Sequence, residues 1–206
     1  MRRLRIKICG VTTAAQADAC ASLGADLIGL NFVPGSPRCI DIARARAIGD
    51  AVRGRVEIVG VVAGQQAPEL GRLRVEARLD RLQLHGDEPP ELLLELAPFA
   101  FKALRVASPE DVALADRYPG LLLIDAKVEG RLGGTGVTVD TALIAPLARV
   151  REVILAGGLT PENVAARIEA VGPAGVDVAG GVERAPGDKD LERVRAFIAE
   201  ARRSSA

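Results

Sequence analysis

Residues 7–12 read Lys-Ile-Cys-Gly-Val-Thr and lie where a short apolar strand, predicted over Leu4–Cys9, meets a loop. Because side chains alternate along a strand, the odd-numbered charged residues and Cys9 share one face, and the even-numbered aliphatic residues share the other. The aliphatic face suits a covering layer of helices, so Lys7 is predicted to point into the interior of a closed sheet. A buried ammonium needs an acidic partner, and the strand carboxylates that could supply it are Asp177, Asp125 and Glu57.

The unit that begins here, a strand followed by a loop and a helix, repeats along the whole chain. Short β-branched and Leu-rich runs alternate with Ala-, Arg-, Glu- and Leu-rich stretches, separated by Gly, Pro, Asp and Ser. The predicted strands are Leu4–Cys9, Leu27–Phe32, Val56–Val62, Arg81–Leu84, Phe101–Arg105, Leu121–Asp125, Glu152–Leu155 and Val176–Val178. The predicted helices are Thr13–Leu23, Ile42–Val52, Pro68–Arg78, Pro89–Ala97, Pro109–Arg117, Asp140–Leu147, Pro161–Val171 and Lys189–Ala201.

This repetition predicts an α/β fold, a compact single-domain (β/α)8 TIM barrel over residues 1–206. Parallel strands need crossover helices, and right-handed crossovers repeated in this way can close the sheet on itself. An open doubly wound sheet is the alternative, but it typically carries a Gly-rich fingerprint after its first strand, and residues 9–12 lack that pattern. Because such barrels typically have about 250 residues, short loops are expected.

Composition and charge exclude several classes of function. Lys plus Arg number 27 and Asp plus Glu number 27, so the chain has no net field that would attract nucleic acid or an anionic membrane. Aromatic residues make up 2% of the chain, which removes the stacking platforms of a single-strand nucleic-acid binder. The N-terminus lacks a signal-peptide pattern and no uncharged apolar run could span a bilayer, so a cytoplasmic protein is predicted. The chain has one histidine and three cysteines, Cys9, Cys20 and Cys39, whose spacing is not that of metal ligands. These features argue against a His-rich metal site, and the odd number of cysteines argues against a disulfide framework.

Functional residues of such a barrel gather at the carboxyl ends of its strands. Cys9 lies at such an end, where a thiolate can act as a base or nucleophile, although a free cysteine is more often a small buried hydrophobe. Two glycine pairs, Gly157-Gly158 and Gly180-Gly181, close the seventh and eighth strands, where backbone N–H groups often bind phosphate. The pairs predict a small phosphorylated substrate, with plain tight turns as the alternative.

Other side chains predicted at the same rim have one functional and one structural interpretation each. Asp125 ends an apolar run, so its carboxyl is suited to deliver a proton, or else to cap a helix or form an ion pair. Arg38 follows Ser-Pro and could hold a substrate carboxylate in a bidentate contact, or else lie solvated at the surface. The glycine-rich segment 133–136 could fold over a ligand or serve as a linker. His85 is predicted to hydrogen-bond a backbone group at the rim, in preference to a role in catalysis.

Taken as a set, these motifs resemble the phosphoribosylanthranilate isomerase family of tryptophan biosynthesis. The resemblance spans essentially the whole chain, and its motifs are specific when they occur together. In chain order they are Lys7–Thr12, Gly24–Gly29, Ser36–Arg38, Gln83–Glu88, Leu123–Ala126, Gly133–Gly136, Ala156–Leu159, Pro161–Val164, Val176–Val178 and Gly181–Glu183.

The resemblance implies an Amadori rearrangement of N-(5-phosphoribosyl)anthranilate that needs no metal and no organic cofactor. In this interpretation Asp125 protonates the ring oxygen, and Cys9 removes the C2 proton of the resulting Schiff base. Arg38 would bind the anthranilate carboxylate, Gly134 would belong to the loop over the ligand, and His85 is a further candidate for contact with the substrate. The phosphate would lie on the backbone of Gly157, Gly158, Ala179 and Gly180.

One departure from the family pattern concerns the phosphate. Ala179-Gly180 stands where the family usually carries serines, so backbone donors and water are expected to bind the phosphate. Two alternatives remain, a non-catalytic barrel that binds a phosphorylated metabolite and another phosphate-binding barrel isomerase or epimerase. An epimerase would need a metal-ligand set or an acidic pair in place of Cys9 and Asp125. A monomer or a homodimer is expected, without nucleic-acid or membrane partners.

Overall fold

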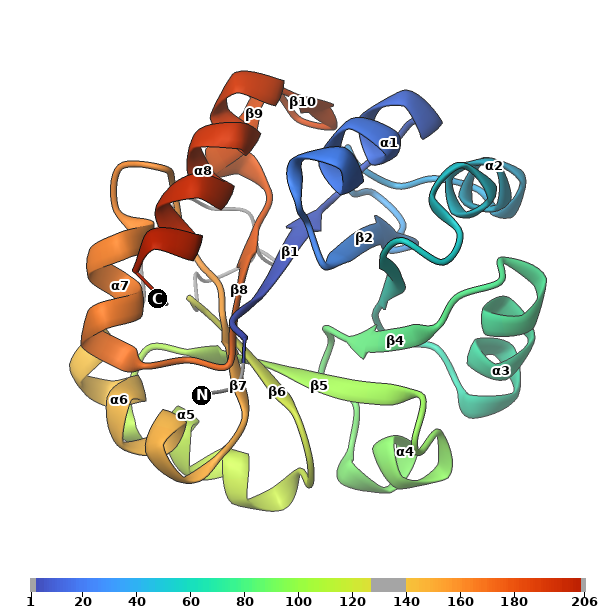
Figure 1. Ribbon diagram of the computed structural model, residues 1–206. Helices are drawn as coiled ribbons and strands as arrows, with labels where there is room; N and C mark the ends of the chain where they lie inside the picture. Colours follow the sequence, from blue (N-terminus) through green and yellow to red (C-terminus); the bar gives the residue numbers. More distant parts are fainter. Residues whose placement is uncertain (1–2, 127–139, 205–206) are drawn as a thin grey trace.

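A computed structural model describes residues 3–126 and 140–204, and in it the strands pair in sequence order and close into a parallel barrel. Figure 1 shows these strands at the centre, with the helices arranged around them. The strands are β1 (Arg5–Cys9), β2 (Leu27–Asn31), β3 (Glu57–Val62), β4 (Arg81–Leu84), β5 (Ala100–Val106), β6 (Leu122–Ala126), β7 (Val153–Leu155) and β8 (Gly175–Val178). The predicted (β/α)8 barrel is therefore confirmed.

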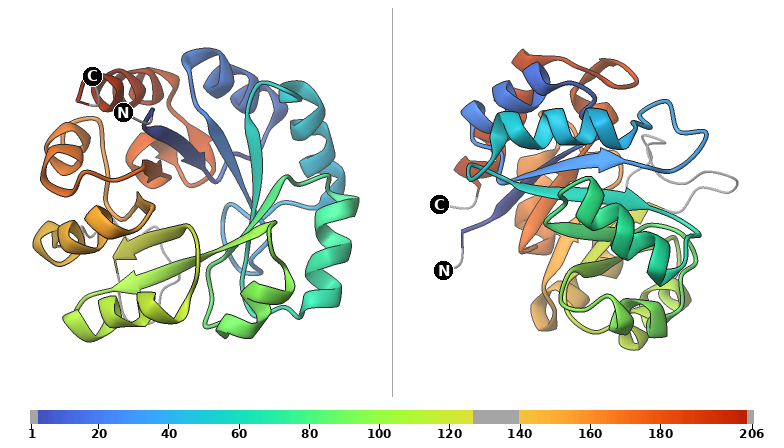
Figure 2. Two further views of the ribbon diagram at one scale, coloured as in Figure 1. Left: turned by 60° about the horizontal axis from the view of Figure 1, so that its bottom comes forward. Right: turned by 90° about the vertical axis from the view of Figure 1, so that its right-hand side faces the viewer.

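The helices form the outer layer and bury one apolar side against the strands. Helix α8 packs beside both α7 and α1, so the helical ring closes where the two ends of the chain meet (Figure 2). The helices are α1 (Ala14–Leu23), α2 (Ile42–Val52), α3 (Ala67–Glu76), α4 (Pro90–Glu95), α5 (Pro109–Ala113), α6 (Thr141–Val150), α7 (Val164–Val171) and α8 (Leu191–Arg203). Among the described residues, no helix has the length and apolar content required to cross a bilayer.

Alternation along the strands separates two buried regions. The large cluster lies between strands and helices, and a smaller one fills the barrel with Leu27, Val59, Phe101, Ala103, Leu121, Leu123, Ile154 and Ala156. Lys7 lies opposite Asp177 in the register that joins β1 to β8 and closes the barrel. The predicted inward orientation of Lys7 is confirmed, and of the three candidate partners the structure selects Asp177, whose Oδ1 lies 2.7 Å from Lys7 Nζ.

Several helices begin or end at other residues than the sequence predicts. Helix α7 begins at Val164 instead of Pro161, because the Asn163 side chain accepts a bond from Thr160 N and donates one to Gly158 O, which holds these residues in a turn. Helix α5 ends at Ala113 and continues as a 3-10 turn over Leu114–Arg117.

A hairpin for which the sequence carries no clear strand signal follows β8. A 3-10 turn, η2 (Gly180–Val182), leads into β9 (Glu183–Ala185), which pairs antiparallel with β10 (Asp188–Lys189). The prediction of a helix from Lys189 was wrong at this end, because Lys189 belongs to β10 and α8 begins only after the capping side chain of Asp190. Figure 1 shows the hairpin beside α1 and α8.

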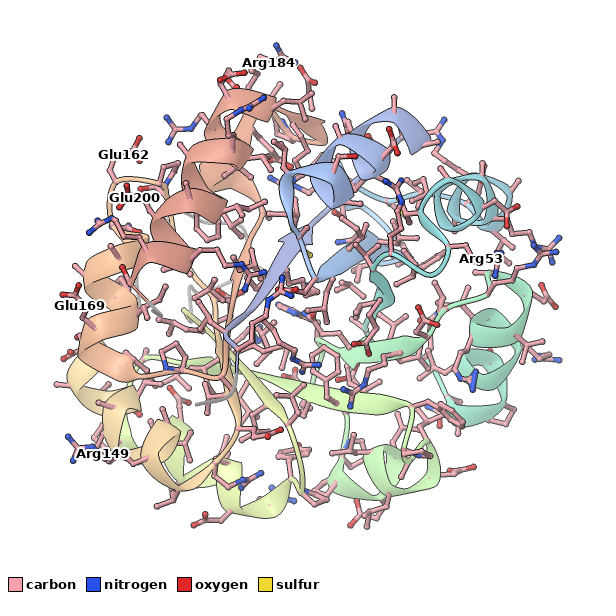
Figure 3. The ribbon with its side chains drawn as sticks, viewed as in Figure 1. Arg53, Arg149, Glu162, Glu169, Arg184 and Glu200 are labelled. Atoms are coloured by element: carbon pink, nitrogen blue, oxygen red, sulfur yellow. The ribbon has the colours of Figure 1, made fainter. Side chains whose placement is uncertain are left out.

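Charged side chains are divided between the surface and the barrel mouth. Figure 3 labels six that lie on the periphery and point outward: Arg53, Arg149, Glu162, Glu169, Arg184 and Glu200. A second group is buried and paired, and includes Lys7, Lys102, Asp177 and Lys189. Burying a charge is unfavourable without a partner, so the buried, paired side chains are the better candidates for a functional role.

Candidate active site

The carboxyl ends of the strands surround a small central cavity of about 90 Å³. Cys9 ends β1, Asp125 lies at the end of β6, and both line this one cavity. Its other lining residues are Asn31, Val33, Ser36, Arg38, Val61, Gln83, His85, Asp177 and Ala179. A thiol and a carboxyl that are far apart in the sequence therefore face the same space.

A second cavity of about 350 Å³ adjoins the first and is formed by the loops after β7 and β8. The four predicted phosphate-binding residues, Gly157, Gly158, Ala179 and Gly180, all line it. The two cavities share Asp125, Asp177 and Ala179 in their linings, so they lie side by side at the mouth.

The glycines of the second cavity are required by its geometry. Gly157 and Gly158 have φ of 83° and 61°, a region that other residues rarely adopt. A Cβ on Gly181 would lie 1.9 Å from the carbonyl oxygen of Leu159, so a side chain there would collide with the neighbouring loop. These features bring the backbone close to any group that enters the cavity.

Cys9 lies above the buried ion pair of Lys7 and Asp177. A Cβ built on Gly29 would lie 2.8 Å from Cys9 Sγ and 3.0 Å from Lys7 Nζ, so the absence of a side chain at Gly29 lets sulfur and ammonium approach each other. Burial raises the pKa of the Cys9 thiol, against the opposing effect of the Lys7 charge. Burial also disfavours the charge on Lys7, but Asp177 holds the pKa of Lys7 above its ordinary value.

His85 lies between Gln83 and Asp125. The amide nitrogen of Gln83 lies 2.7 Å from His85 Nδ1, and His85 Nε2 lies 3.5 Å from Asp125 Oδ2. Because the Gln83 amide nitrogen is a donor, it assigns the ring proton to Nε2, on the side of Asp125. The ring therefore contacts side chains instead of the predicted backbone group, since Gln83 precedes His85 by two residues on the same strand face.

Arg38 reaches the central cavity, as predicted, but it is also held in an ion pair that the sequence analysis did not predict. Its Nε lies 2.9 Å from Glu183 Oε1, and its Nη2 lies 2.6 Å from Glu183 Oε2. Only 14% of the Arg38 side chain is exposed, so the guanidinium and its ion pair with Glu183 are largely enclosed. The only signal for this partner in the sequence was the place of Glu183 at the end of the last family-like motif.

Comparison with known proteins decides the family. A sequence profile described as N-(5'-phosphoribosyl)anthranilate isomerase matches residues 6–200. The chain belongs to the phosphoribosylanthranilate isomerase family. A Pseudomonas aeruginosa protein with that description, from strain LESB58, is 46% identical over 201 residues, which are 96% of this chain and 95% of the relative.

Solved phosphoribosylanthranilate isomerase structures share the barrel. The enzyme from Thermus thermophilus superposes with a TM-score of 0.87 at 42% identity, covering 96% of this chain and 98% of that one. Another, in complex with reduced 1-(o-carboxyphenylamino)-1-deoxyribulose 5-phosphate, has a TM-score of 0.85 at 35% identity, with coverage of 96% and 98%.

Within this phosphoribosylanthranilate isomerase barrel, all but one of the predicted site residues gather at the mouth. The exception is Gly134, which with the rest of the segment 133–136 lies outside the described residues. Cys20 is buried in α1, where it packs, and Cys39 is exposed. No three His, Cys, Asp or Glu side chains within residues 3–126 and 140–204 converge as a metal site would require.

Proposed function

We propose that the chain catalyses the isomerisation of N-(5-phosphoribosyl)anthranilate to 1-(2-carboxyphenylamino)-1-deoxyribulose 5-phosphate in tryptophan biosynthesis. The observation that supports this most strongly is that Cys9 and Asp125 line one cavity, directly beside a second cavity lined by glycines. A relative of the same family holds the reduced form of that product in its structure.

The first step is the opening of the sugar ring. The Asp125 carboxyl donates its proton to the ring oxygen while the C1–O bond breaks, and the nitrogen lone pair forms a C1=N Schiff base. Asp125 is 6% exposed, so a proton that it carries is delivered inside the mouth. The His85 Nε2–H group near its Oδ2 then stabilises the carboxylate that remains.

The second step is proton removal from C2. The iminium at C1 makes the C2–H bond acidic, so the Cys9 thiolate can take this proton, and the electron pair forms a C1=C2 enol while nitrogen regains its lone pair. Protonation of C1 and loss of the enol O–H proton then give the ketone. Lys7 lies close to the sulfur and stabilises the thiolate, which burial alone would disfavour.

The two ends of the substrate are bound by different groups. The phosphate is assigned to the cavity of about 350 Å³ that the turns after β7 and β8 line, with the backbone N–H groups of these turns as its proposed donors. Residues 179–182, directly after β8, include no serine, so phosphate binding depends on these backbone donors and on water. The anthranilate carboxylate pairs with Arg38, in a charge-assisted contact.

Arg38→Ala is expected to weaken substrate binding. Loss of a charge-assisted contact to a carboxylate raises KM by about 10-fold to 100-fold. A smaller decrease in kcat is expected as well, because the substrate is held less firmly at the reacting atoms. Steady-state kinetics would check this, with the exposed Arg53→Ala as the control. An unchanged KM would assign the carboxylate to another group.

The thiol of Cys9 carries the pH dependence that the structure supports. Burial raises the pKa of this thiol above its ordinary value, against the opposing charge of Lys7. The thiolate of the free enzyme is therefore expected to form only above the ordinary pKa of a cysteine thiol, about 8.5.

Alkylation of Cys9 by iodoacetamide, measured from about pH 6.5 to pH 10, checks this prediction. The alkylation rate is expected to rise with pH without levelling off below about pH 8.5. A rate that is already level at neutral pH would show that the charge of Lys7 outweighs the effect of burial on the thiol.

Turnover itself is tested with the purified chain. Phosphoribosylanthranilate is generated enzymatically in the cuvette, and its fluorescence is followed after the protein is added. The proposed function requires an enzyme-dependent loss of fluorescence with formation of the ketose product. Binding of the substrate without turnover would favour the non-catalytic barrel instead.

A further inference from the structure

The ammonium group of Lys189 lies at the centre of a buried network beneath the mouth. Lys189 is 1% exposed, although it belongs to a short hairpin that follows the barrel. Its Nζ lies 2.5 Å from the carbonyl oxygen of Cys9, 2.7 Å from Glu183 Oε1 and 3.3 Å from the carbonyl oxygen of Ala179. One cation therefore contacts the end of β1, the loop after β8 and strand β9.

The network continues from Glu183 to Arg38. Glu183 accepts bonds from Lys189 and from two guanidinium nitrogens of Arg38, and the backbone N–H of Gly187 also donates to it, at 3.2 Å. Burial disfavours its charge, but the bonds from Arg38 and the charge of Lys189 hold the pKa of Glu183 below its ordinary value. The carboxylate is therefore ionised at neutral pH and joins two cations.

The hairpin that carries Lys189 is tied to the loop after β1 and to the first turn of α1. Thr12 Oγ1 donates a bond of 2.8 Å to the carbonyl oxygen of Gly187, and Gln16 Nε2 donates another of 3.2 Å. Arg38 is also confined from the other side, because its Cδ would lie 2.3 Å from a Cβ on Gly10. The network is therefore held on both sides by the segment that follows Cys9.

Three parts of the proposed site meet in this network. They are the strand end that carries Cys9, the loop that lines the phosphate cavity at Ala179, and the guanidinium of Arg38. These parts lie far apart in the sequence, and a buried cation with several acceptors is directional enough to set their relative positions. Burying the charge of Lys189 is unfavourable, and apolar side chains could fill the same space if packing were the only requirement. The buried charge therefore indicates a role beyond packing.

We propose that Lys189 and Glu183 are positioning residues for substrate recognition. Lys189 aligns the ends of β1 and β8, and through Glu183 it orients Arg38 toward the carboxylate of the substrate. The inference rests on the proposed function, since it assigns these residues to the binding of that substrate. Neither residue is required to touch the reacting atoms.

Glu183→Gln tests the step from Glu183 to Arg38. Glutamine has the same size, but it lacks the charge, and an amide nitrogen in place of Oε2 cannot accept the bond that Arg38 Nη2 donates. KM is expected to rise by about 10-fold, and kcat is expected to change by less than about threefold, because Arg38 loses its orientation while Cys9 and Asp125 stay in place.

A double-mutant cycle with Arg38→Ala separates positioning from a general structural role. If Glu183 acts on KM through Arg38, then Glu183→Gln has less than about a twofold effect on KM once Arg38 is alanine. A structural role would instead multiply the two effects. Asp188→Asn is the matched control, because its carboxylate pairs with Arg184 on the outer side of the same hairpin (Figure 3).

Lys189→Met tests the alignment of the strand ends. Methionine fills a similar volume without the charge, and the carbonyl groups of Cys9 and Ala179 lose their shared donor. A rise in KM and a fall in kcat, each by about 10-fold or more, are expected together, because the base and the phosphate loop both move. Circular dichroism and thermal unfolding test whether the variant is folded. If it is not folded, the double-mutant cycle of Glu183→Gln with Arg38→Ala is the test of the proposal.

The outcomes are distinguishable. An effect of Glu183→Gln on KM that disappears in the Arg38→Ala background supports the inference. Multiplying effects, or a wild-type KM in Glu183→Gln, overturn it while the proposed function stands. Absence of turnover in the wild-type protein overturns the proposed function, and the inference with it.

Discussion

Cys9→Ser is expected to lower kcat by about 10³-fold and to leave KM within about threefold of the wild-type value. Serine fits the space of the thiol, but a hydroxyl ionises at far higher pH, so almost no alkoxide is present to remove the C2 proton. The groups proposed to bind the substrate, Arg38 and the glycine turns, are unchanged. Steady-state kinetics from the fluorescence of phosphoribosylanthranilate measure both constants.

Cys39→Ser is the matched control for this variant. Cys39 is exposed, and the same substitution there removes a thiol that the proposed mechanism does not use. Its kinetics are expected to match the wild type. Turnover of Cys9→Ser near the wild-type rate would show that another group is the base.

Asp125→Asn is the second substitution expected to have a large effect, again about 10³-fold on kcat with little change in KM. The amide has the shape of the carboxyl and still offers an oxygen to His85, but it has no acidic proton to give to the ring oxygen. Ring opening then becomes the slow step, and the substrate remains bound in its closed form.

Asp87→Asn provides the control at the same end of the barrel. Asp87 pairs with Arg105, and its side chain is 91% exposed. Loss of this carboxylate is expected to leave kcat and KM unchanged, because exposed ion pairs contribute little and Asp87 lies outside the central cavity. A wild-type rate in Asp125→Asn would remove Asp125 from the mechanism.

The barrel could be predicted because the sequence signals for its strands and helices lie within each short segment. Each strand is a short apolar run between turn residues, and each is followed by a helical stretch, so the topology follows from a repeated unit. Strand parity also predicted that Lys7 points inward and needs a carboxylate. Only the choice of Asp177 from three candidates required the structure, because the register between β1 and β8 depends on closure of the barrel.

The gathering of Cys9, Asp125 and the glycine turns could be predicted for the same reason, since strand order places their ends at one rim. The network of Glu183 and Lys189 could not. Both residues are charged and lie in a stretch that reads as a loop and a helix start, where charge is normally solvated. Their burial depends on contacts across the chain, such as the bond from Lys189 to Cys9, 180 residues away.

The hairpin escaped prediction because it carries little strand signal. Strands β9 and β10 have three and two residues, without an apolar alternation. The turn depends on Gly187, whose φ of 84° suits glycine, but an isolated glycine is also common after many other elements. Contacts from outside the hairpin also hold it, because Thr12 and Gln16 both donate to the carbonyl of Gly187.

A crystal structure of the wild-type chain with reduced 1-(o-carboxyphenylamino)-1-deoxyribulose 5-phosphate tests the arrangement of the site most directly. We expect the phosphate on the turns at Gly157 and Gly180, with Cys9 Sγ about 3.5 Å from C2. The oxygen that ring opening releases should lie within hydrogen-bond distance of the Asp125 carboxyl. A ligand whose phosphate lies elsewhere, or whose sugar is not flanked by this sulfur and this carboxyl, would contradict it.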